Sequence, residues 1–195
     1  EDIAYKKYEE NTPSEFEKFR DAVICVGRIE PRKNQLSLVK ALDGSKYKLI
    51  LVGQVSKNQT GYFKQIQKYL KNNDNFTYIP QIDNEKLYQL YKVCRVSALP
   101  SWLDTPGLVS LEAGAMGCNL AISTRGSTKE YFKDYAYYCE PDDINSIRNA
   151  VDNAYTASKN NDLQMLILQN YTWKIAAERT LEAYKTVLNR ASNKK

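Results

Sequence analysis

Residues 21–53 read DAVICVGRIEPRKNQLSLVKALDGSKYKLILVG, and this stretch decides the fold class. Two continuously apolar runs, residues 23–27 and 48–53, lie on either side of residues 34–42, which are rich in apolar side chains at helix-like spacing. Strands that are apolar at every position are typical of parallel sheets covered on both faces. The stretch therefore predicts a β-strand, an α-helix and a second, parallel β-strand.

The same alternation continues along the rest of the sequence. Further strands are predicted at residues 76–79, 95–99, 119–123 and 137–139, and further helices at residues 60–70, 85–93, 109–116, 144–157 and 172–189. We expect an α/β fold with a doubly wound, Rossmann-like parallel sheet in three α/β/α layers. Residues 1–20 are expected to form a lead-in or linker segment, residues 21–190 a single domain, and residues 191–195 a frayed tail.

The composition excludes several classes of enzyme. The 195 residues include 28 Lys and Arg against 23 Asp and Glu, a formal charge of +5, and no histidine. A Ser-His-Asp triad, a Cys-His dyad and a His-ligated zinc site therefore cannot be built from this chain alone, and no metal site is expected. The positive charges are spread along the sequence, which favours small anionic ligands over nucleic acid.

The cysteines and the hydropathy of the sequence indicate the cellular compartment in which the domain is expected. Cys25, Cys94, Cys118 and Cys139 form no CxxC pair and stand in apolar runs, as buried free thiols do, with a disulfide as the alternative. No signal peptide opens the sequence, and no apolar stretch approaches the roughly 18 to 20 residues of a membrane span. We expect a reduced, soluble, intracellular domain.

The first candidate site follows the first predicted strand. Residues 27–34 read GRIEPRKN, so that Arg28, Arg32 and Lys33 crowd one strand-to-helix turn. Neither a GxGxxG nor a GxxxxGK[ST] phosphate loop is present. A helix N-terminus with Arg and Lys beside it is suited to a diphosphate, because amides, dipole and guanidinium all favour the same anion. The alternative is a solvated basic turn.

The second candidate site follows the fourth predicted strand. Residues 98–117 read ALPSWLDTPGLVSLEAGAMG, with Asp104 on the loop and Glu112 eight positions later within a predicted helix. Glu112 stands among apolar residues, where a carboxylate needs a partner. A carboxylate can accept two hydrogen bonds from a vicinal diol such as a ribose. The alternative is a purely structural role for both carboxylates.

Together the two segments resemble the C-terminal domain of retaining glycosyltransferases of the GT-B fold, in the glycosyl transferases group 1 family (glycosyltransferase family four). VGRIEPRKN resembles the family's GRxxxxKG turn, and DTPGLVSLEAGAMGCNLAIS resembles its E-x7-E signature. FTYIPQIDNEKLYQLYKVCRVSALPSWLD and STRGSTKEYFKDYAYYCEPDD resemble the segments between and after these motifs. The resemblance extends over residues 23–188.

The resemblance implies a role for each matching residue. Arg28 and Lys33 would hold the diphosphate of a nucleotide-sugar donor and stabilise charge on the leaving nucleotide without a metal. Asp104 would face the donor sugar, and Glu112 would bind the ribose. The remaining donor-binding positions are Pro106, Gly107, Leu108 and Val109 beside the sugar and phosphates, and Tyr78 and Ile79 beside the base. The only small molecule implied is a UDP-, GDP- or ADP-sugar, and no cofactor is expected.

Three departures from the family pattern bear on these roles. Asp104 stands where Glu is usual, Pro106 replaces an aromatic residue, and Asn34 replaces a glycine, a mild change because Asn tolerates the left-handed backbone conformation. The first two favour the alternative of a non-catalytic nucleotide- or sugar-binding module. A GT-B-like epimerase would lack the paired motifs, and a dehydrogenase would carry the glycine fingerprint.

The resemblance also implies a longer enzyme. This chain would be one half of a GT-B fold, inactive by itself, whose missing N-terminal half binds a saccharide or lipid-linked acceptor. The implied role is transfer of a sugar, with retention, in polysaccharide or glycolipid biosynthesis. The implied location is the cytoplasm, at the inner face of the cell membrane through peripheral association.

Overall fold

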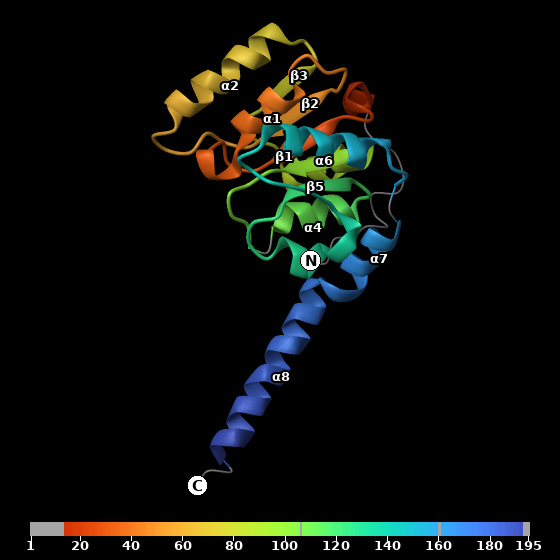
Figure 1. The fold of residues 1–195 in the computed structure, drawn as a ribbon. Coiled ribbons are helices and arrows are strands. Elements are labelled where there is room, and N and C mark those ends of the chain that lie inside the picture. The colour runs from red at the N-terminus through yellow and green to blue at the C-terminus, as the bar shows by residue number, and fades with distance from the viewer. Residues whose placement is uncertain (1–13, 106, 160, 193–195) are drawn as a thin grey trace.

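The computed structural model describes residues 14–105, 107–159 and 161–192, and these residues form a parallel sheet with helices on both faces (Figure 1). The strands are β1 (Val23–Val26), β2 (Leu49–Val52), β3 (Phe76–Ile79), β4 (Val96–Leu99), β5 (Asn119–Ser123) and β6 (Tyr137–Cys139). Their order across the six-stranded sheet is β3-β2-β1-β4-β5-β6, and every pair is parallel. The predicted doubly wound sheet is confirmed.

The burial of the strands explains their composition. Every residue of β1, β2, β4 and β5 is buried, whereas the edge strands β3 and β6 are partly exposed. Inner strands of a parallel sheet are covered by helices on both faces, so their two sets of side chains both enter the core. This is why VICV and LILV are apolar without alternation.

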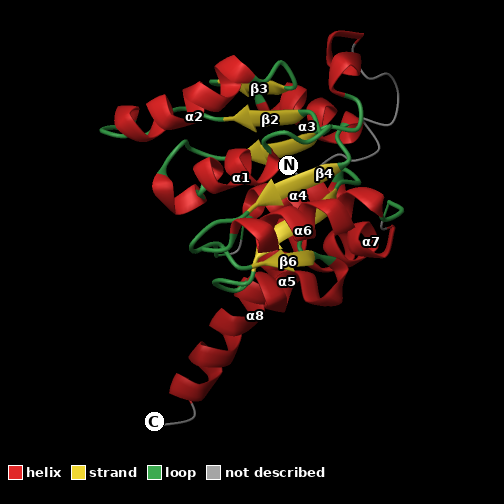
Figure 2. Ribbon diagram, turned by 45° about the horizontal axis from the view of Figure 1, so that its top comes forward, coloured by secondary structure: helices red, strands yellow, loops and turns green. Residues whose placement is uncertain are grey.

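The helices form two layers (Figure 2). Contacts join α1 (Gln35–Leu42) with α2 (Thr60–Asn72) and α6 (Ile144–Thr156), and join α4 (Leu108–Ala115) with α3 (Asn84–Val93) and α7 (Asn161–Asn170). The connections from β1 to β2 and from β2 to β3 run in one direction across the sheet, and those from β3 onward run in the other. Because βαβ crossovers are right-handed, the helices of the two sets lie on opposite faces. The sequence did not predict α7 or the short α5 (Thr128–Phe132), which is followed by the 3-10 turn η4 (Lys133–Tyr135).

The end of the lead-in segment packs onto the domain. The 3-10 helix η2 (Ser14–Phe19) buries Phe16 and Phe19, which are three positions apart and therefore on one side of a 3-10 helix. Asp21 N–H donates to the Val93 carbonyl, which ties the segment to the end of α3. Residues 1–13 and 193–195 of the expected lead-in and tail lie outside the described residues.

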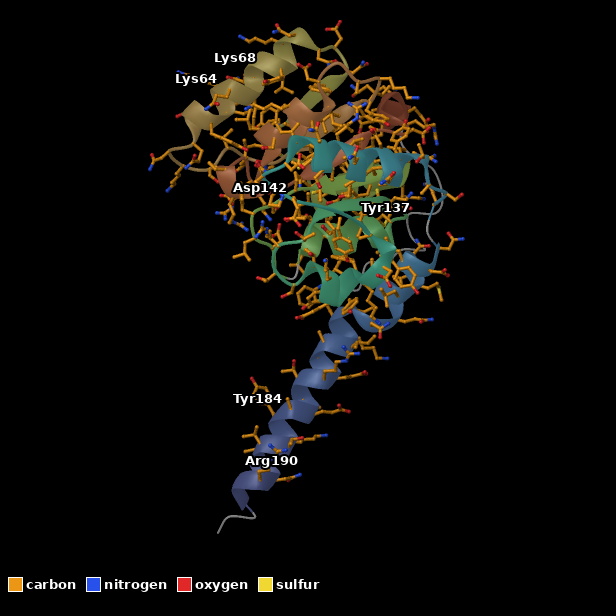
Figure 3. The ribbon with its side chains drawn as sticks, viewed as in Figure 1. Lys64, Lys68, Tyr137, Asp142, Tyr184 and Arg190 are labelled. Carbon is orange, nitrogen blue, oxygen red and sulfur yellow. The ribbon has the colours of Figure 1, made fainter. Side chains whose placement is uncertain are left out.

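The last helix, α8 (Trp173–Ser192), leaves the body of the domain (Figures 1 and 3). No side chain between residues 173 and 190 is buried, and Leu181, Tyr184, Val187 and Leu188 are each more than half exposed. No helix in the described ranges has the length and hydropathy needed to cross a membrane.

The predicted burial of the free thiols is confirmed for all four cysteines.

Candidate functional site

The strand order places a crevice between β1 and β4. From β1 the chain proceeds to β2 on one side of the sheet, and from β4 it proceeds to β5 on the other. In such sheets, ligands bind outside the carboxyl ends of the two strands where the direction reverses. The segments that leave these ends are residues 27–34 and 100–107, which are the two candidate sites found in the sequence.

Backbone hydrogen bonds join the two segments. Trp102 N–H donates to the Arg32 carbonyl over 2.9 Å, and the Arg32 guanidinium donates to the Leu103 carbonyl over 2.8 Å. The intervening 3-10 turn η3 (Pro31–Lys33) turns the chain into α1. The basic turn after β1 is therefore held against the loop that carries Asp104.

Asn34 links this pair of loops to a third. It adopts the left-handed conformation with φ of 59°, as the sequence predicts that Asn can, and it is 5% exposed. Its Nδ2 donates to the Pro100 carbonyl over 3.0 Å and to the Pro141 carbonyl over 2.7 Å. A glycine would adopt the same backbone conformation but would make neither hydrogen bond.

Lys33 and Asp104 form an ion pair in the crevice. Lys33 Nζ lies 2.7 Å from Asp104 Oδ1, and the two side chains are 12% and 10% exposed. Arg32 lies 3.7 Å from the same oxygen. The other oxygen, Asp104 Oδ2, is buried and has no hydrogen-bond partner among the described residues. Oδ1 of this carboxylate is thus paired with a cation, and Oδ2 lacks a hydrogen-bond donor in the part of the chain that the structure describes.

Arg28 and Arg32 face a second carboxylate, that of Glu30. Arg32 lies 3.0 Å and Arg28 3.6 Å from Glu30 Oε1, while Ser56 Oγ donates to Glu30 Oε2 over 2.8 Å. The Arg28 side chain is 68% exposed. The sequence analysis missed Glu30, although a single acidic residue within a basic turn was the available signal.

A close approach of two backbones shapes the loop around Asp104. A Cβ on Gly126 would lie 2.2 Å from the Asp104 carbonyl oxygen, and these residues form an isolated parallel bridge. Gly107, with φ of 71°, precedes the first residue of α4. Leu108 is half exposed and Val109 half-buried, whereas Pro106 lies outside the described residues.

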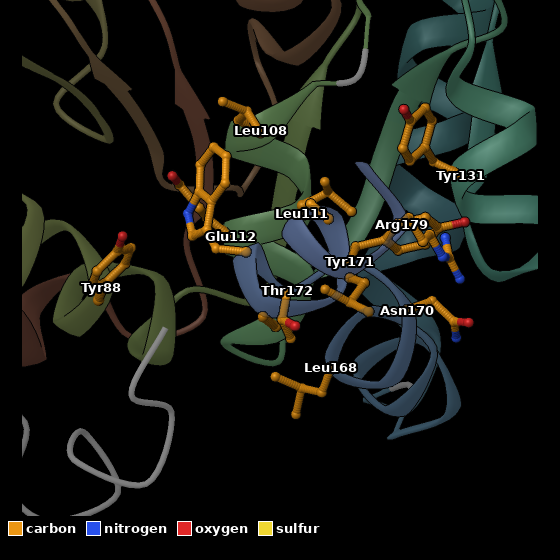
Figure 4. Close-up of a pocket in the computed structure, with 14 residues that line it drawn as sticks. Tyr88, Leu108, Leu111, Glu112, Tyr131, Leu168, Asn170, Tyr171, Thr172 and Arg179 are labelled. Carbon is orange, nitrogen blue, oxygen red and sulfur yellow. The ribbon is translucent and has the colours of Figure 1, made fainter. Parts of the chain in front are cut away.

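Glu112 lies on a different cavity, of about 580 Å³, between α4 and the α7–α8 junction (Figure 4). Leu108 and Leu111 line it from α4, and Tyr171 and Arg179 line it from the C-terminal segment. Desolvation raises the pKa of the Glu112 carboxyl above its ordinary value. Among the described residues it has no ion-pair partner, and nothing brings it into contact with the Lys33–Asp104 pair.

A smaller cavity, of about 310 Å³, lies at the carboxyl ends of β1, β2 and β3. It is lined by Val26, Gly27, Arg28, Val52, Gly53, Gln54, Pro80, Gln81, Ile82 and Leu87. Arg28 is shared between this cavity and the basic turn, so the two adjoin.

The expected base-side residues Tyr78 and Ile79 lie one step before this cavity. The Tyr78 hydroxyl donates to the Gly53 carbonyl, and Gly53 N–H donates to the Ile79 carbonyl, each over 3.0 Å. Both groups are therefore already engaged. The cavity presents instead the hydrogen-bonded amides of Gln54 and Gln81, which sequence reasoning missed.

Comparisons with known proteins identify the family of the chain. The family model described as Glycosyl transferases group 1 matches residues 7–173. A glycosyltransferase of Methanocaldococcus jannaschii, MJ1607, is 25% identical over 85% of this chain and 45% of its own length. The serotype-specific mannosyltransferase WbdA of Escherichia coli is 26% identical over 80% of this chain and 20% of its own. The chain thus spans less than half the length of these relatives.

Solved structures share the fold. A sucrose-phosphate synthase of Thermosynechococcus elongatus superposes with a TM-score of 0.75 at 23% identity, covering 87% of this chain and 46% of that one. An Escherichia coli trehalose-6-phosphate protein bound with UDP-2-fluoro glucose superposes with a TM-score of 0.69 at 16% identity, covering 86% and 46%. At these identities the likeness establishes the fold, a Rossmann-like α/β domain found in GT-B glycosyltransferases. Because the family model matches residues 7–173, which is most of its length, this chain belongs to the glycosyl transferases group 1 family.

Proposed function

We propose that the chain is the donor-binding half of a retaining glycosyltransferase that transfers a sugar from a nucleotide-sugar. The observation that carries the proposal is the convergence of Arg28, Arg32 and Lys33 with Asp104 at the topological switch point. Cations fixed at the carboxyl edge of a parallel sheet, beside a helix N-terminus, form a site suited to a diphosphate.

In this proposal the parts of the donor lie in order along the 310 Å³ cavity and the crevice. The base enters the 310 Å³ cavity beside Gln54 and Gln81, and Arg28, at its rim, reaches the diphosphate. Lys33 holds the second phosphate, and Asp104 faces the sugar from the neighbouring loop. Gly107, Leu108 and Val109, at the start of α4, lie beside the phosphates and sugar. The ribose role of Glu112 stays a prediction, because its side chain lines the separate 580 Å³ cavity.

The chemical role of these cations is electrostatic. When the bond from the anomeric carbon to the phosphate oxygen breaks, negative charge develops on the leaving nucleoside diphosphate. Arg28 and Lys33 are positioned before the reaction and stabilise that charge in a partly water-excluded crevice. The step requires no other charged group, and we propose that transfer is independent of a metal.

The acceptor is assigned to a second half. The chain spans 45% of the M. jannaschii relative, and Leu181, Tyr184 and Val187 of α8 are each more than half exposed. Large exposed apolar surfaces mark interaction sites. We place an N-terminal half there, which binds a saccharide or lipid-linked acceptor for polysaccharide or glycolipid synthesis. The names of two E. coli relatives, a serotype-specific mannosyltransferase and an O-antigen chain mannosyltransferase, support a role in polysaccharide synthesis. We further propose that the longer protein acts in the cytoplasm, at the inner face of the membrane.

A non-catalytic binding module is the second candidate. The observation that favours it is the Lys33–Asp104 ion pair, in which the short carboxylate is engaged by a lysine of its own site. This candidate keeps the nucleotide site and loses transfer. A transfer assay with the longer protein separates the two, because only the enzyme releases nucleoside diphosphate in proportion to sugar transferred.

The experiment that tests the donor site is titration calorimetry of this chain with UDP, GDP and ADP, each in magnesium and in EDTA. Saturable binding of one nucleotide, equal in both buffers, is expected and identifies the base. Arg28→Ala should lose that binding while retaining the parent melting temperature, because its side chain is mostly exposed. If neither the parent nor any variant with a changed charge at residues 28, 33 or 104 binds any of the three nucleotides, the proposal is contradicted.

A further inference from the structure

The cations of the candidate site already have counter-ions within the chain. Lys33 is 2.7 Å from Asp104, and both Arg28 and Arg32 face Glu30. Three positive charges are thus opposed by two carboxylates before any ligand arrives. A diphosphate that binds here must compete with those carboxylates.

The competition is strongest at Lys33. Its ammonium and the Asp104 carboxylate are almost enclosed, so water screens their attraction poorly. The lysine stem passes Gly27, where an added Cβ would lie 3.5 Å from Lys33 Cε, and the side chain as a whole is only 12% exposed. A phosphate that reaches Lys33 therefore approaches Asp104 as well, and two anions repel each other across one cation.

The second oxygen of Asp104 offers a way to offset that repulsion. Oδ2 is buried without a hydrogen-bond partner among the described residues, and an unsatisfied buried acceptor is costly. If sugar binding widens the crevice enough to uncover Oδ2, a sugar hydroxyl can donate to it, whereas a nucleoside diphosphate ends in phosphate oxygens that near neutral pH are mainly acceptors.

We propose that Asp104 is a built-in counter-ion of Lys33 that makes the site discriminate between a nucleotide-sugar and the free nucleoside diphosphate. This inference rests on the proposed donor site. The complete donor offsets the charge competition through its sugar hydroxyls, and the leaving nucleotide does not. Asp104 therefore weakens retention of the product, and it acts as a specificity-determining residue rather than only as a sugar contact.

The inference predicts that removal of a site residue tightens binding of a ligand. In Asp104→Asn, Lys33 loses its counter-ion, and the affinity for the preferred nucleoside diphosphate should rise by about tenfold or more. The affinity for the matching nucleotide-sugar should rise less or fall, because the amide is a poorer acceptor. The ratio of the two dissociation constants is therefore the diagnostic quantity.

A charge-matched control is available at the same end of the sheet. Asp142, in the loop after β6, is 58% exposed at its side chain and 4.0 Å from Arg125, outside the crevice. Asp142→Asn changes the net charge of the chain by the same amount as Asp104→Asn. It should change both dissociation constants by less than about twofold, because the Asp142 side chain is more than half exposed and solvent and salt screen its charge.

The experiment is calorimetric titration of the parent chain, Asp104→Asn, Asp104→Ala and Asp142→Asn with a nucleoside diphosphate and its nucleotide-sugar. Melting temperatures are recorded to confirm that each variant folds, and Asp104→Ala removes the charge by a second route. The inference is supported if both Asp104 variants bind the nucleoside diphosphate more tightly than the parent and Asp142→Asn does not. It is also supported if the parent binds no nucleoside diphosphate and the two Asp104 variants do. If the parent binds and the Asp104 variants bind equally or more weakly, the inference is wrong and the donor site stands. If no protein binds either ligand, the donor site and the inference are both wrong.

Discussion

The two sides of the candidate site are built by different means. On the side of residues 28–34 and 100–104, charged groups are paired with one another, and Asn34 ties three loops together. On the side of the 310 Å³ cavity, the strand ends are brought together by backbone, with Gly27 and Gly53 in conformations that favour glycine. The comparison indicates that charge pairing shapes the side proposed for the phosphates, and that close backbone packing shapes the side proposed for the base.

Gly53→Ala is expected to have the largest effect and tests the base side. A Cβ at this position would lie 2.2 Å from the Gly27 carbonyl oxygen, and the φ of 142° is strained for any other residue. We expect a loss of about 4 kcal/mol or more in the free energy of unfolding, or failure to fold. Urea denaturation measures the loss.

Gly61→Ala is the matched control. Gly61 lies near the start of α2, and an added Cβ there meets nothing within 4 Å. Since Ala has the higher helix propensity, this change should stabilise the protein by up to about 1 kcal/mol. If Gly53→Ala and Gly61→Ala lower the free energy of unfolding equally, the close approach of the Gly53 and Gly27 backbones does not shape this side of the site.

Lys33→Ala is expected to have the next largest effect and tests the phosphate side. It leaves Asp104 as a largely enclosed charge without its lysine, which should reduce the free energy of unfolding by about 3 kcal/mol. Arg28→Ala should reduce it by less than about 0.5 kcal/mol, because the side chain is exposed.

Both substitutions should nevertheless weaken nucleoside diphosphate binding by about 1.5 to 3 kcal/mol, the scale of a charge-assisted hydrogen bond. Thermal denaturation and calorimetry on the same preparations separate the two effects. If both variants bind as tightly as the parent, the assignment of the phosphate side is wrong.

Asn34→Gly tests whether hydrogen bonds between loops contribute as much as charge. Glycine keeps the left-handed backbone but leaves the Pro100 and Pro141 carbonyls without their donor. We expect a loss of about 2 kcal/mol in the free energy of unfolding, from two hydrogen bonds of about 1 kcal/mol each. Asn34→Ala should lose roughly 1 kcal/mol more, because its Cβ disfavours this conformation. A chemical denaturation series of the three proteins that shows no difference would contradict this role.

Glu112→Gln is expected to have the smallest effect on stability. Burial raises the pKa of Glu112, so the folded protein holds this proton more tightly than the unfolded chain. Stability therefore falls as pH rises from the unfolded pKa through the folded one, and it remains lower at neutral pH. The substitution should raise the melting temperature slightly at neutral pH and leave it unchanged near about pH 4.

The same variant tests the ribose assignment. Glu112→Gln should weaken binding of a nucleoside diphosphate and leave inorganic pyrophosphate, which has no ribose, unaffected. An equal loss for both ligands would indicate a general disturbance of the crevice instead.

Most of the sheet could be predicted because each strand carries its own signal. β1 and β2 are apolar at every position, β4 and β5 are mostly apolar, and the predicted strand bounds agree with the structure within about two residues. By contrast, α7 was missed because only Leu163 and Ile167 of its ten residues are buried, which is too weak a pattern to recognise. Phe16 and Phe19 were missed because a six-residue 3-10 helix is too short for its apolar spacing to stand out among charged residues.

The site was predictable in its residue types but not in its pairings. The sequence placed cations after β1 and carboxylates after β4, since both motifs are local. Lys33 and Asp104 are 71 positions apart, so their ion pair depends on strand order, which local patterns do not specify. Tyr78 and Ile79 stay predictions for the base side; they are hydrogen-bonded to Gly53, and the adjoining cavity is lined by Gln54 and Gln81, which local patterns did not single out.

The exposure of α8 has a consequence for any measurement of unfolding. A helix of 20 residues extends roughly 30 Å, and none of its side chains between residues 173 and 190 contributes to the core. Isolated helices of this length are marginal in water. Loss of helical circular dichroism from α8 should therefore precede the cooperative transition of the sheet, and amide hydrogens of this helix should exchange with solvent long before those of β1 and β4.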